Sequence, residues 1–187
     1  MPDPDSVVRA CLSPAARRIH LAKARSVGLF RACPTMTEAE GILILWYTSN
    51  ASQAFLDRLR RHTETECDRN RSEVLAEAIG KLPRWSGSPI HRVIVVEAAD
   101  VPTFVMKYAK GRTVVWPAIT SCSASSAFRR HGNARFIVEH RSGRVIGPHS
   151  WHPDEHEVVL PPGCAFSVET IVAVDGSPVE VELQEVE

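Results

Sequence analysis

Long apolar runs are missing from this sequence of 187 residues. No stretch approaches the roughly 20 apolar residues that a transmembrane helix requires. Residues 1–5 are acidic and lack the basic-then-apolar pattern of a cleaved signal peptide. We therefore expect no membrane partner, and a protein that stays in a cytosol or is exported without a cleaved signal.

Cysteine is scarce, and no Cys-x-x-Cys pair occurs. The cysteines are Cys11, Cys33, Cys67, Cys122 and Cys164. An odd number of widely scattered cysteines is typical of a reducing compartment. The sequence therefore argues against a disulfide scaffold.

Two kinds of site motif are also missing. The histidines His149, His152 and His156 have no nearby cysteine to complete a tetrahedral zinc site, so no metal is expected. No Gly-x-Ser-x-Gly turn supports a serine hydrolase built from Ser121, His152 and Asp154.

A net charge of either sign is lacking, because 22 basic residues balance 22 acidic residues. A neutral chain has no overall field that attracts nucleic acid, so nucleic acid is not expected as a partner. The basic residues comprise 18 Arg and 4 Lys, and Arg clusters could still bind phosphate through their planar guanidinium groups. The run 58–61 is expected to be a solvated helix face.

The order of elements predicts an α+β fold in about one domain. Residues 6–82 are mostly helical in pattern, with Ser13 as a helix start, a capping box at Thr37 and Glu40, and helices near 51–62 and 72–81. Residues 90–187 are mostly strand-like. Strands are predicted at 90–97, 113–119, 135–139, 157–160, 165–174 and 178–183, with a hairpin turn at Asp175 and Gly176.

Three short segments of the strand-rich half could carry chemistry. Arg92 interrupts an apolar strand; it is either an exposed edge residue or a buried cation that meets an anion. Ser121 and Ser123 end another strand on one face, and taken alone they could form a simple polar turn. Glu155 and Glu157 stand two residues apart, where like charges can divide roles or merely form a solvated acidic loop.

In combination these segments resemble the Arg–Ser–Glu class of mono-ADP-ribosyltransferases, of the arginine-specific type with a Glu-x-Glu motif. Residues 150–163 resemble the stretch of that family that leads through paired glutamates into a Pro-Pro-Gly turn. Residues 37–62 resemble its helical lobe. The resemblance implies an N-terminal helical lobe on a mixed two-sheet β core, with a single domain over 1–187. It divides the chain into an extension (1–35), a helical lobe (36–85) and an NAD-binding core (86–187).

The resemblance also implies roles for the motif residues in cleaving NAD⁺, the expected co-substrate. Glu157 would stabilise the cationic ribose, and Ser121, assisted by Ser123, would hold Glu157 in position. Arg92 would bind the phosphate side of the dinucleotide. The backbone of Val93 would hold the nicotinamide amide.

The remaining residues of the predicted site concern the acceptor and a cofactor loop. Glu155 would face an acceptor guanidinium. Trp151 would contact the target protein or cover the edge of the core. Phe128 and Arg130 would contact NAD⁺ or form a helix end with solvated basic residues. Val93 departs from the family's usual Gly or Ala, which could crowd the pocket.

The expected function is the transfer of ADP-ribose from NAD⁺ to an arginine of a target protein. A bacterial toxin or secreted effector that acts in a target-cell cytosol fits the family's habit. NAD⁺ glycohydrolysis and a catalytically degenerate binding module are the alternatives. Residues 1–35 could be a core helix, a secretion segment or the binding site of an immunity protein or inhibitor.

Overall fold

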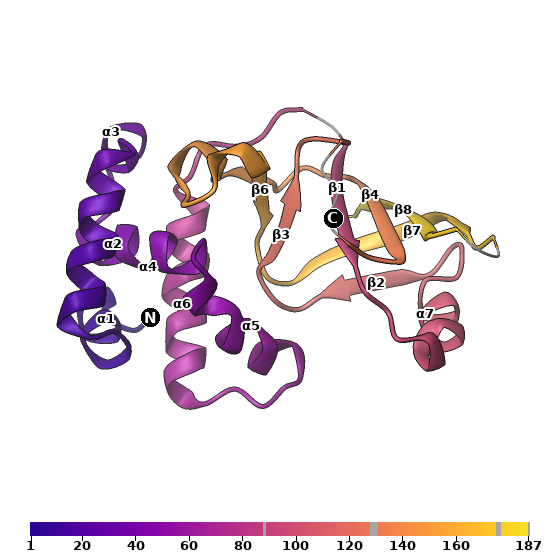
Figure 1. The fold of residues 1–187 in the computed structure, drawn as a ribbon, viewed down its shortest axis with the longest axis horizontal. Coiled ribbons are helices and arrows are strands. Elements are labelled where there is room, and N and C mark those ends of the chain that lie inside the picture. Colours follow the sequence, from indigo (N-terminus) through magenta and orange to yellow (C-terminus); the bar gives the residue numbers. More distant parts are fainter. Residues whose placement is uncertain (88, 128–130, 175–176, 187) are drawn as a thin grey trace.

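A layer of helices packs against one side of a strongly curved sheet in the computed structural model (Figure 1). The structure describes residues 1–87, 89–127, 131–174 and 177–186. The predicted turn at Asp175 and Gly176 lies outside these residues. The α+β prediction is confirmed, because the helices come first along the chain and the strands follow.

Six α-helices come before the first strand. They are α1 (Pro4–Cys11), α2 (Pro14–Ser26), α3 (Leu29–Ala32), α4 (Glu38–Tyr47), α5 (Gln53–Arg60) and α6 (Glu66–Gly80). The predicted start at Ser13 is confirmed, since its hydroxyl accepts a hydrogen bond from the Ala16 amide. The predicted capping box at Thr37 and Glu40 is also confirmed. Such caps satisfy amide groups that a helix leaves without partners at its N-terminus.

Two helices differ from the prediction. Helix α6 begins at Glu66 rather than near residue 72, because Thr65 and Asp68 form a second capping box. Helix α7 (Val101–Lys107) was not predicted; it is short and has a proline in its first turn. Short 3-10 turns also occur, and η1 (Asn50–Ser52), η3 (Gly147–His149) and η4 (Pro153–Glu155) border the site described below.

Eight strands form one hydrogen-bonded series in the order β2-β7-β8-β4-β1-β3-β6-β5. They are β1 (Ile90–Ile94), β2 (Thr113–Trp116), β3 (Thr120–Ser123), β4 (Ala134–Glu139), β5 (Arg144–Val145), β6 (Glu157–Leu160), β7 (Cys164–Val172) and β8 (Val179–Glu185). The sheet is mixed, because β4 and β8 run parallel while the other pairs are antiparallel. The prediction of two separate sheets is not confirmed; β1 and β3 join the two halves at the pair His91 and Ser123.

The sheet curls around an aromatic cluster. The ring centroids of Trp116 on β2 and Phe136 on β4 lie 5.4 Å apart, although two strands separate β2 from β4 in the sheet order. Phe166 on β7 packs on Trp116 at 4.8 Å. Rings on strands this far apart can meet only if the sheet bends, so its concave side encloses a core of its own.

A second core lies between the helices and the β3–β6 end of the sheet. Helix α4 occupies its centre, and each of its residues from Ala39 to Tyr47 is buried. A helix that is apolar on every side must be surrounded, and α1, α2 and α6 pack around α4. Ile119, Ile146 and Val159 complete this core from the strand half, which fixes the helical layer beside β3 and β6.

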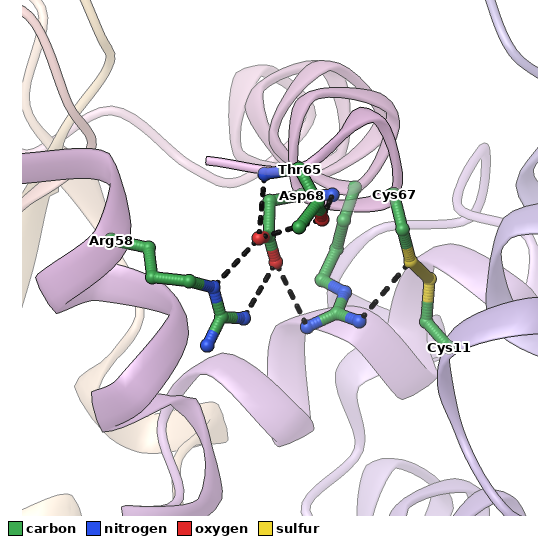
Figure 2. The surroundings of a disulfide bond; sticks show 6 residues. Cys11, Arg58, Thr65, Cys67 and Asp68 are labelled. Atoms are coloured by element: carbon green, nitrogen blue, oxygen red, sulfur yellow. Dashed lines mark hydrogen bonds and ion pairs between the residues drawn. A yellow bond between two sulfur atoms is a disulfide. The ribbon is translucent and has the colours of Figure 1, made fainter. Parts of the chain in front are cut away.

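A disulfide between Cys11 and Cys67 joins α1 to the first turn of α6, which corrects the expectation of reduced, scattered cysteines (Figure 2). The two residues are 56 positions apart in the chain, and only the packing of α1 on α6 brings them together. Cys33, Cys122 and Cys164 are reduced and buried. The bridge fastens the N-terminal extension to the helical layer.

Candidate active site

A pocket of about 410 Å³ lies where the end of α4, the turn η1 and helix α5 face strands β1, β3 and β6. Its size is within the range of small-molecule sites. The residues that line it are Tyr47, Thr48, Ser49, Asn50, Ser52, Gln53, Leu56, Arg60, His91, Arg92, Val93, Ser121, Cys122, Ser123, His152, Glu155 and Glu157. Most are polar, so the pocket suits a polar, charged ligand.

Glu157 is the first residue of β6, and its side chain is held in place by Ser121. The Ser121 hydroxyl donates a hydrogen bond of 2.6 Å to Oε1 of Glu157. The residues lie on paired strands, since β3 and β6 align Ser121 with Val159 and Ser123 with Glu157. Glu157 is only 9% exposed, so its orientation is restricted before any ligand arrives.

Arg92 enters the same pocket from β1. Its Nη1 donates a hydrogen bond of 2.6 Å to the backbone carbonyl of Ser121, which ties the arginine to the strand that holds Glu157. Burial lowers the pKa of Arg92 from its usual value because burial disfavours the charged form. Arginine nevertheless keeps its charge in proteins. The pocket therefore contains a fixed, half-buried cation that would favour an anionic ligand group.

Glu155 also lines the pocket, but it lies outside strand β6, which begins at Glu157. It ends the 3-10 turn η4, and the next residue, His156, has a left-handed backbone with φ of 48°. The Ser123 hydroxyl donates to the Glu155 carbonyl at 2.8 Å, and the Ala124 amide donates to the His156 carbonyl at 2.9 Å. A turn, and not strand alternation, brings both carboxylates to one pocket.

Two lining residues, Arg60 and Tyr47, were not predicted or were interpreted differently. Arg60 lines the pocket from α5, which corrects the prediction that the run 58–61 is simply a solvated face. Arg58 of the same run is paired with Asp68 instead. Tyr47 lies at the end of α4, and its buried hydroxyl has no hydrogen-bond partner among the described residues. Burial and the charge of Glu157 raise the pKa of Tyr47, so the phenol is a neutral donor.

Cys122 lies between the two serines and lines the pocket, yet it is not a nucleophile. Burial raises the pKa of its thiol to about 12. A nucleophilic cysteine requires a substantial thiolate fraction near neutral pH. The chemistry of this pocket therefore rests on the carboxylates, hydroxyls and guanidinium groups.

The predicted residues do not all meet in the pocket. Val93 lines it beside Arg92, so the larger side chain leaves the pocket open. The ring of Trp151 packs against α2, and among the described residues it is not part of the lining. Phe128 and Arg130 lie outside the described residues.

Comparison of sequences gives one informative relative and no matching family model. A protein of Mycobacterium avium (strain 104), Mav, is 31% identical over 129 residues, or 65% of this chain. Its name provisionally assigns it NAD(+)–arginine ADP-ribosyltransferase activity. The matched region spans 15% of the length of Mav.

Solved structures match nearly the whole chain. The type III effector XopAI from Xanthomonas axonopodis pv. citri has a TM-score of 0.74 at 15% identity, over 91% of this chain and 76% of that one. ADP-ribosyltransferase HopU1 of Pseudomonas syringae pv. Tomato DC3000 has a TM-score of 0.71 at 14% identity, over 94% and 98%. The fold is that of the ADP-ribosyltransferases. ADP-ribosyltransferase Vis, solved in complex with agmatine, matches with a TM-score of 0.65 at 18% identity, over 100% of this chain and 88% of Vis.

The ADP-ribosyltransferase fold implied by the sequence motifs is thus confirmed. Within it, the motif residues Arg92, Ser121 and Glu157 come from β1, β3 and β6, which are neighbours in the sheet order β1-β3-β6. In the described parts of the chain, no group of His, Cys, Asp or Glu side chains could hold a metal ion. No helix of those parts is long and apolar enough to cross a membrane.

Proposed function

We propose that this chain cleaves NAD⁺ between nicotinamide and ribose and transfers the ADP-ribose to an arginine of a target protein. The observation that carries the proposal is the hydrogen bond of 2.6 Å from Ser121 to Glu157, in the same pocket as Arg92. The name of the Mycobacterium relative supports arginine as the acceptor. The complex of Vis with agmatine supports it too, because agmatine carries a guanidinium group like that of arginine.

The proposed reaction breaks the bond between C1′ of the ribose and the nicotinamide nitrogen. Nicotinamide leaves with the bonding electron pair, and positive charge develops on the ribose. The Glu157 carboxylate stabilises that charge and accepts a hydrogen bond from the ribose 2′-hydroxyl. Because Ser121 already orients this carboxylate, little reorganisation is needed as the charge forms.

The cationic residues hold the opposite side of the dinucleotide. Arg92 from β1 and Arg60 from α5 line the same pocket, so two guanidinium groups can bind the diphosphate from two elements. The neutral Tyr47 hydroxyl provides a further donor there. The Val93 backbone holds the nicotinamide amide, and contacts of Phe128 and Arg130 with NAD⁺ stay a prediction from the sequence.

The acceptor enters on the side of Glu155. A nitrogen of the acceptor guanidinium attacks C1′ and forms the new bond, and its proton passes to the Glu155 carboxylate. Glu155 also pairs with the acceptor's charge, which orients it for attack. Delivery into the cytosol of another cell, as an effector or toxin, is proposed because XopAI is a type III effector.

The test uses wild type, Glu157→Gln and Glu155→Gln with labelled NAD⁺ and agmatine. We expect Glu157→Gln to lose nicotinamide release and transfer together, by at least about 100-fold. We expect Glu155→Gln to lose transfer while it still hydrolyses NAD⁺. Calorimetry with NAD⁺ checks that both variants still bind.

Other outcomes would contradict the proposal in distinct ways. Equal loss of hydrolysis and transfer in Glu155→Gln would remove the division of labour between the glutamates. Nicotinamide release without labelled agmatine or protein would indicate a glycohydrolase. Wild-type protein that does not bind NAD⁺ would indicate a degenerate binding module.

A further inference from the structure

The loop that carries Glu155, residues 147–156, is fastened to the N-terminal helix α2. Nδ1 of His149 donates a hydrogen bond of 3.1 Å to the Val27 carbonyl, directly after α2. Figure 1 shows this loop, between β5 and β6, on the side of the sheet where the helices lie. The loop therefore meets a segment more than 100 residues earlier in the chain.

Trp151 is the main anchor of this contact. Its ring packs edge-on against the ring of His20 on α2, with centroids 5.9 Å apart at an interplanar angle of 81°. The ammonium of Lys23, one turn further along α2, lies 5.2 Å from the Trp151 ring. The Trp151 amide also donates to the Thr48 hydroxyl at 3.4 Å. His20 is only 7% exposed, so its ring is packed rather than solvated.

A chain of hydrogen bonds leads from this anchor to Glu155. The hydroxyl of Ser150, itself buried, accepts from the His152 amide at 3.0 Å. The Glu155 amide then donates to the His152 carbonyl at 3.1 Å. The conformation of the turn that carries Glu155 is thus linked to the packing of Trp151 on α2.

Glu157 is held by different contacts. Its strand pairs with β3, and its carbonyl accepts a hydrogen bond of 3.1 Å from the Ile146 amide. Ser121 holds its carboxylate. A change in the α2 contact should therefore move Glu155 and leave Glu157 in place.

We propose that α2 is a positioning element for acceptor transfer, in which His20 and Lys23 hold Trp151 and so hold the Glu155 turn. This inference rests on the proposed function, because it assigns the transfer step to the α2 contact and the cleavage step to the sheet. It gives residues 14–26 of the N-terminal extension a role in the reaction. Trp151 then acts through the loop and not through contact with the target.

The test compares His20→Ala and Lys23→Ala with wild type in two assays. One measures nicotinamide release from NAD⁺ alone, and the other measures transfer to agmatine. We expect kcat/KM for agmatine to fall about tenfold in His20→Ala and less in Lys23→Ala, with NAD⁺ hydrolysis within twofold of wild type. His20→Phe retains an aromatic edge and should restore transfer. Arg18→Ala, an exposed change on the same helix, is the matched control.

Amide hydrogen exchange supplies a readout that does not depend on activity. We expect faster exchange of residues 147–156 in His20→Ala and Lys23→Ala, and unchanged exchange of β6. A parallel loss of hydrolysis and transfer would indicate general destabilisation and overturn the inference. Unchanged loop exchange in both variants would also overturn it. Wild-type protein that releases no nicotinamide would instead overturn the proposed function.

Discussion

At the scale of single residues, the hydroxyl of Ser121 should determine how well Glu157 works. Ser121→Ala removes a hydrogen bond to a charged group, which contributes about 1.5–3 kcal/mol. If that bond is retained when charge develops on the ribose, kcat for NAD⁺ cleavage should fall about 10- to 100-fold. Affinity for NAD⁺, measured by calorimetry, should change little, because Arg92 is unaltered.

A matched change separates this effect from a general disturbance of β3. Ser123→Ala lies on the same strand, and its hydroxyl binds the backbone carbonyl of Glu155 and not the Glu157 carboxylate. We expect Ser123→Ala to reduce agmatine transfer more than NAD⁺ hydrolysis. If Ser121→Ala were as active in hydrolysis as wild type, the positioning of Glu157 by Ser121 would be wrong.

The sequence predicts the motif residues better than their neighbours. The order of three short motifs along the chain predicts Arg92, Ser121 and Glu157, and the structure brings these residues to one pocket. Arg60 and Tyr47 were missed because the direction of a side chain on a helix depends on how that helix packs. Arg58 and Arg60 are neighbours of the same type in the sequence, but Arg58 pairs with Asp68 whereas Arg60 lines the pocket.

At the scale of elements, Asp68 connects α6 to α5. Its contribution to stability should be full at neutral pH and should decrease in acid. It caps α6 through Thr65, and its carboxylate accepts two hydrogen bonds from the Arg58 guanidinium, at 2.7 and 2.8 Å (Figure 2). The Arg58 guanidinium holds the pKa of Asp68 well below its usual range. Because the native pKa is depressed, this contribution is present above about pH 4 and is lost as pH falls.

We therefore expect Asp68→Asn to lower the free energy of unfolding by about 1–2 kcal/mol at pH 7, since the exposure of Arg58 weakens the pair. The difference from wild type should shrink at pH 3. Urea unfolding at both pH values measures it. Asp57→Asn, in an exposed pair with Arg60, is the control and should change stability by less than about 0.5 kcal/mol. A difference that grows on acidification would contradict this prediction.

The start of α6 could be predicted only in part. The apolar residues of α6 become regular only after about residue 72, and its first turns are polar. Their helical state depends on the Thr65–Asp68 cap and on Arg71, whose guanidinium lies 4.4 Å from the Trp46 ring of α4. The spacing of Thr65 and Asp68 is itself visible in the sequence, like that of Thr37 and Glu40, whereas the contact of Arg71 with Trp46 depends on tertiary packing.

At the scale of the whole molecule, the Cys11–Cys67 disulfide should contribute strongly to stability. A bridge across 56 positions lowers the conformational entropy of the unfolded chain. In the chain-entropy account, this raises the free energy of the unfolded state by about 4 kcal/mol. We expect the double variant Cys11→Ser and Cys67→Ser to have a free energy of unfolding lower by that amount. Its midpoint in urea unfolding should therefore lie at a lower urea concentration. Dithiothreitol should shift wild type to the same midpoint and leave the double variant unchanged. A wild-type midpoint unaffected by dithiothreitol would contradict the prediction.

The hydrophobic pattern predicts a helical part over 6–82 and a strand-rich part over 90–187, because helices and strands place apolar residues at different spacings. The disulfide could not be predicted, since Cys11 and Cys67 share no motif and meet only through the contact of α1 with α6. The joining of the strands into one continuous sheet could not be predicted from the sequence either. It depends on one pair, His91 and Ser123, between strands that are far apart in sequence.

The left-handed backbone of His156 sets a strict limit on how this loop can change in length. Glu157 is fixed by strand register, whereas Glu155 reaches the pocket only because the chain reverses at His156. Inserting or deleting one residue between the glutamates would keep the second carboxylate and turn the first away. A length change before Pro153 would leave the turn at His156 intact, but it would shift Trp151 relative to α2 and so disturb Glu155 while Glu157 stays in register.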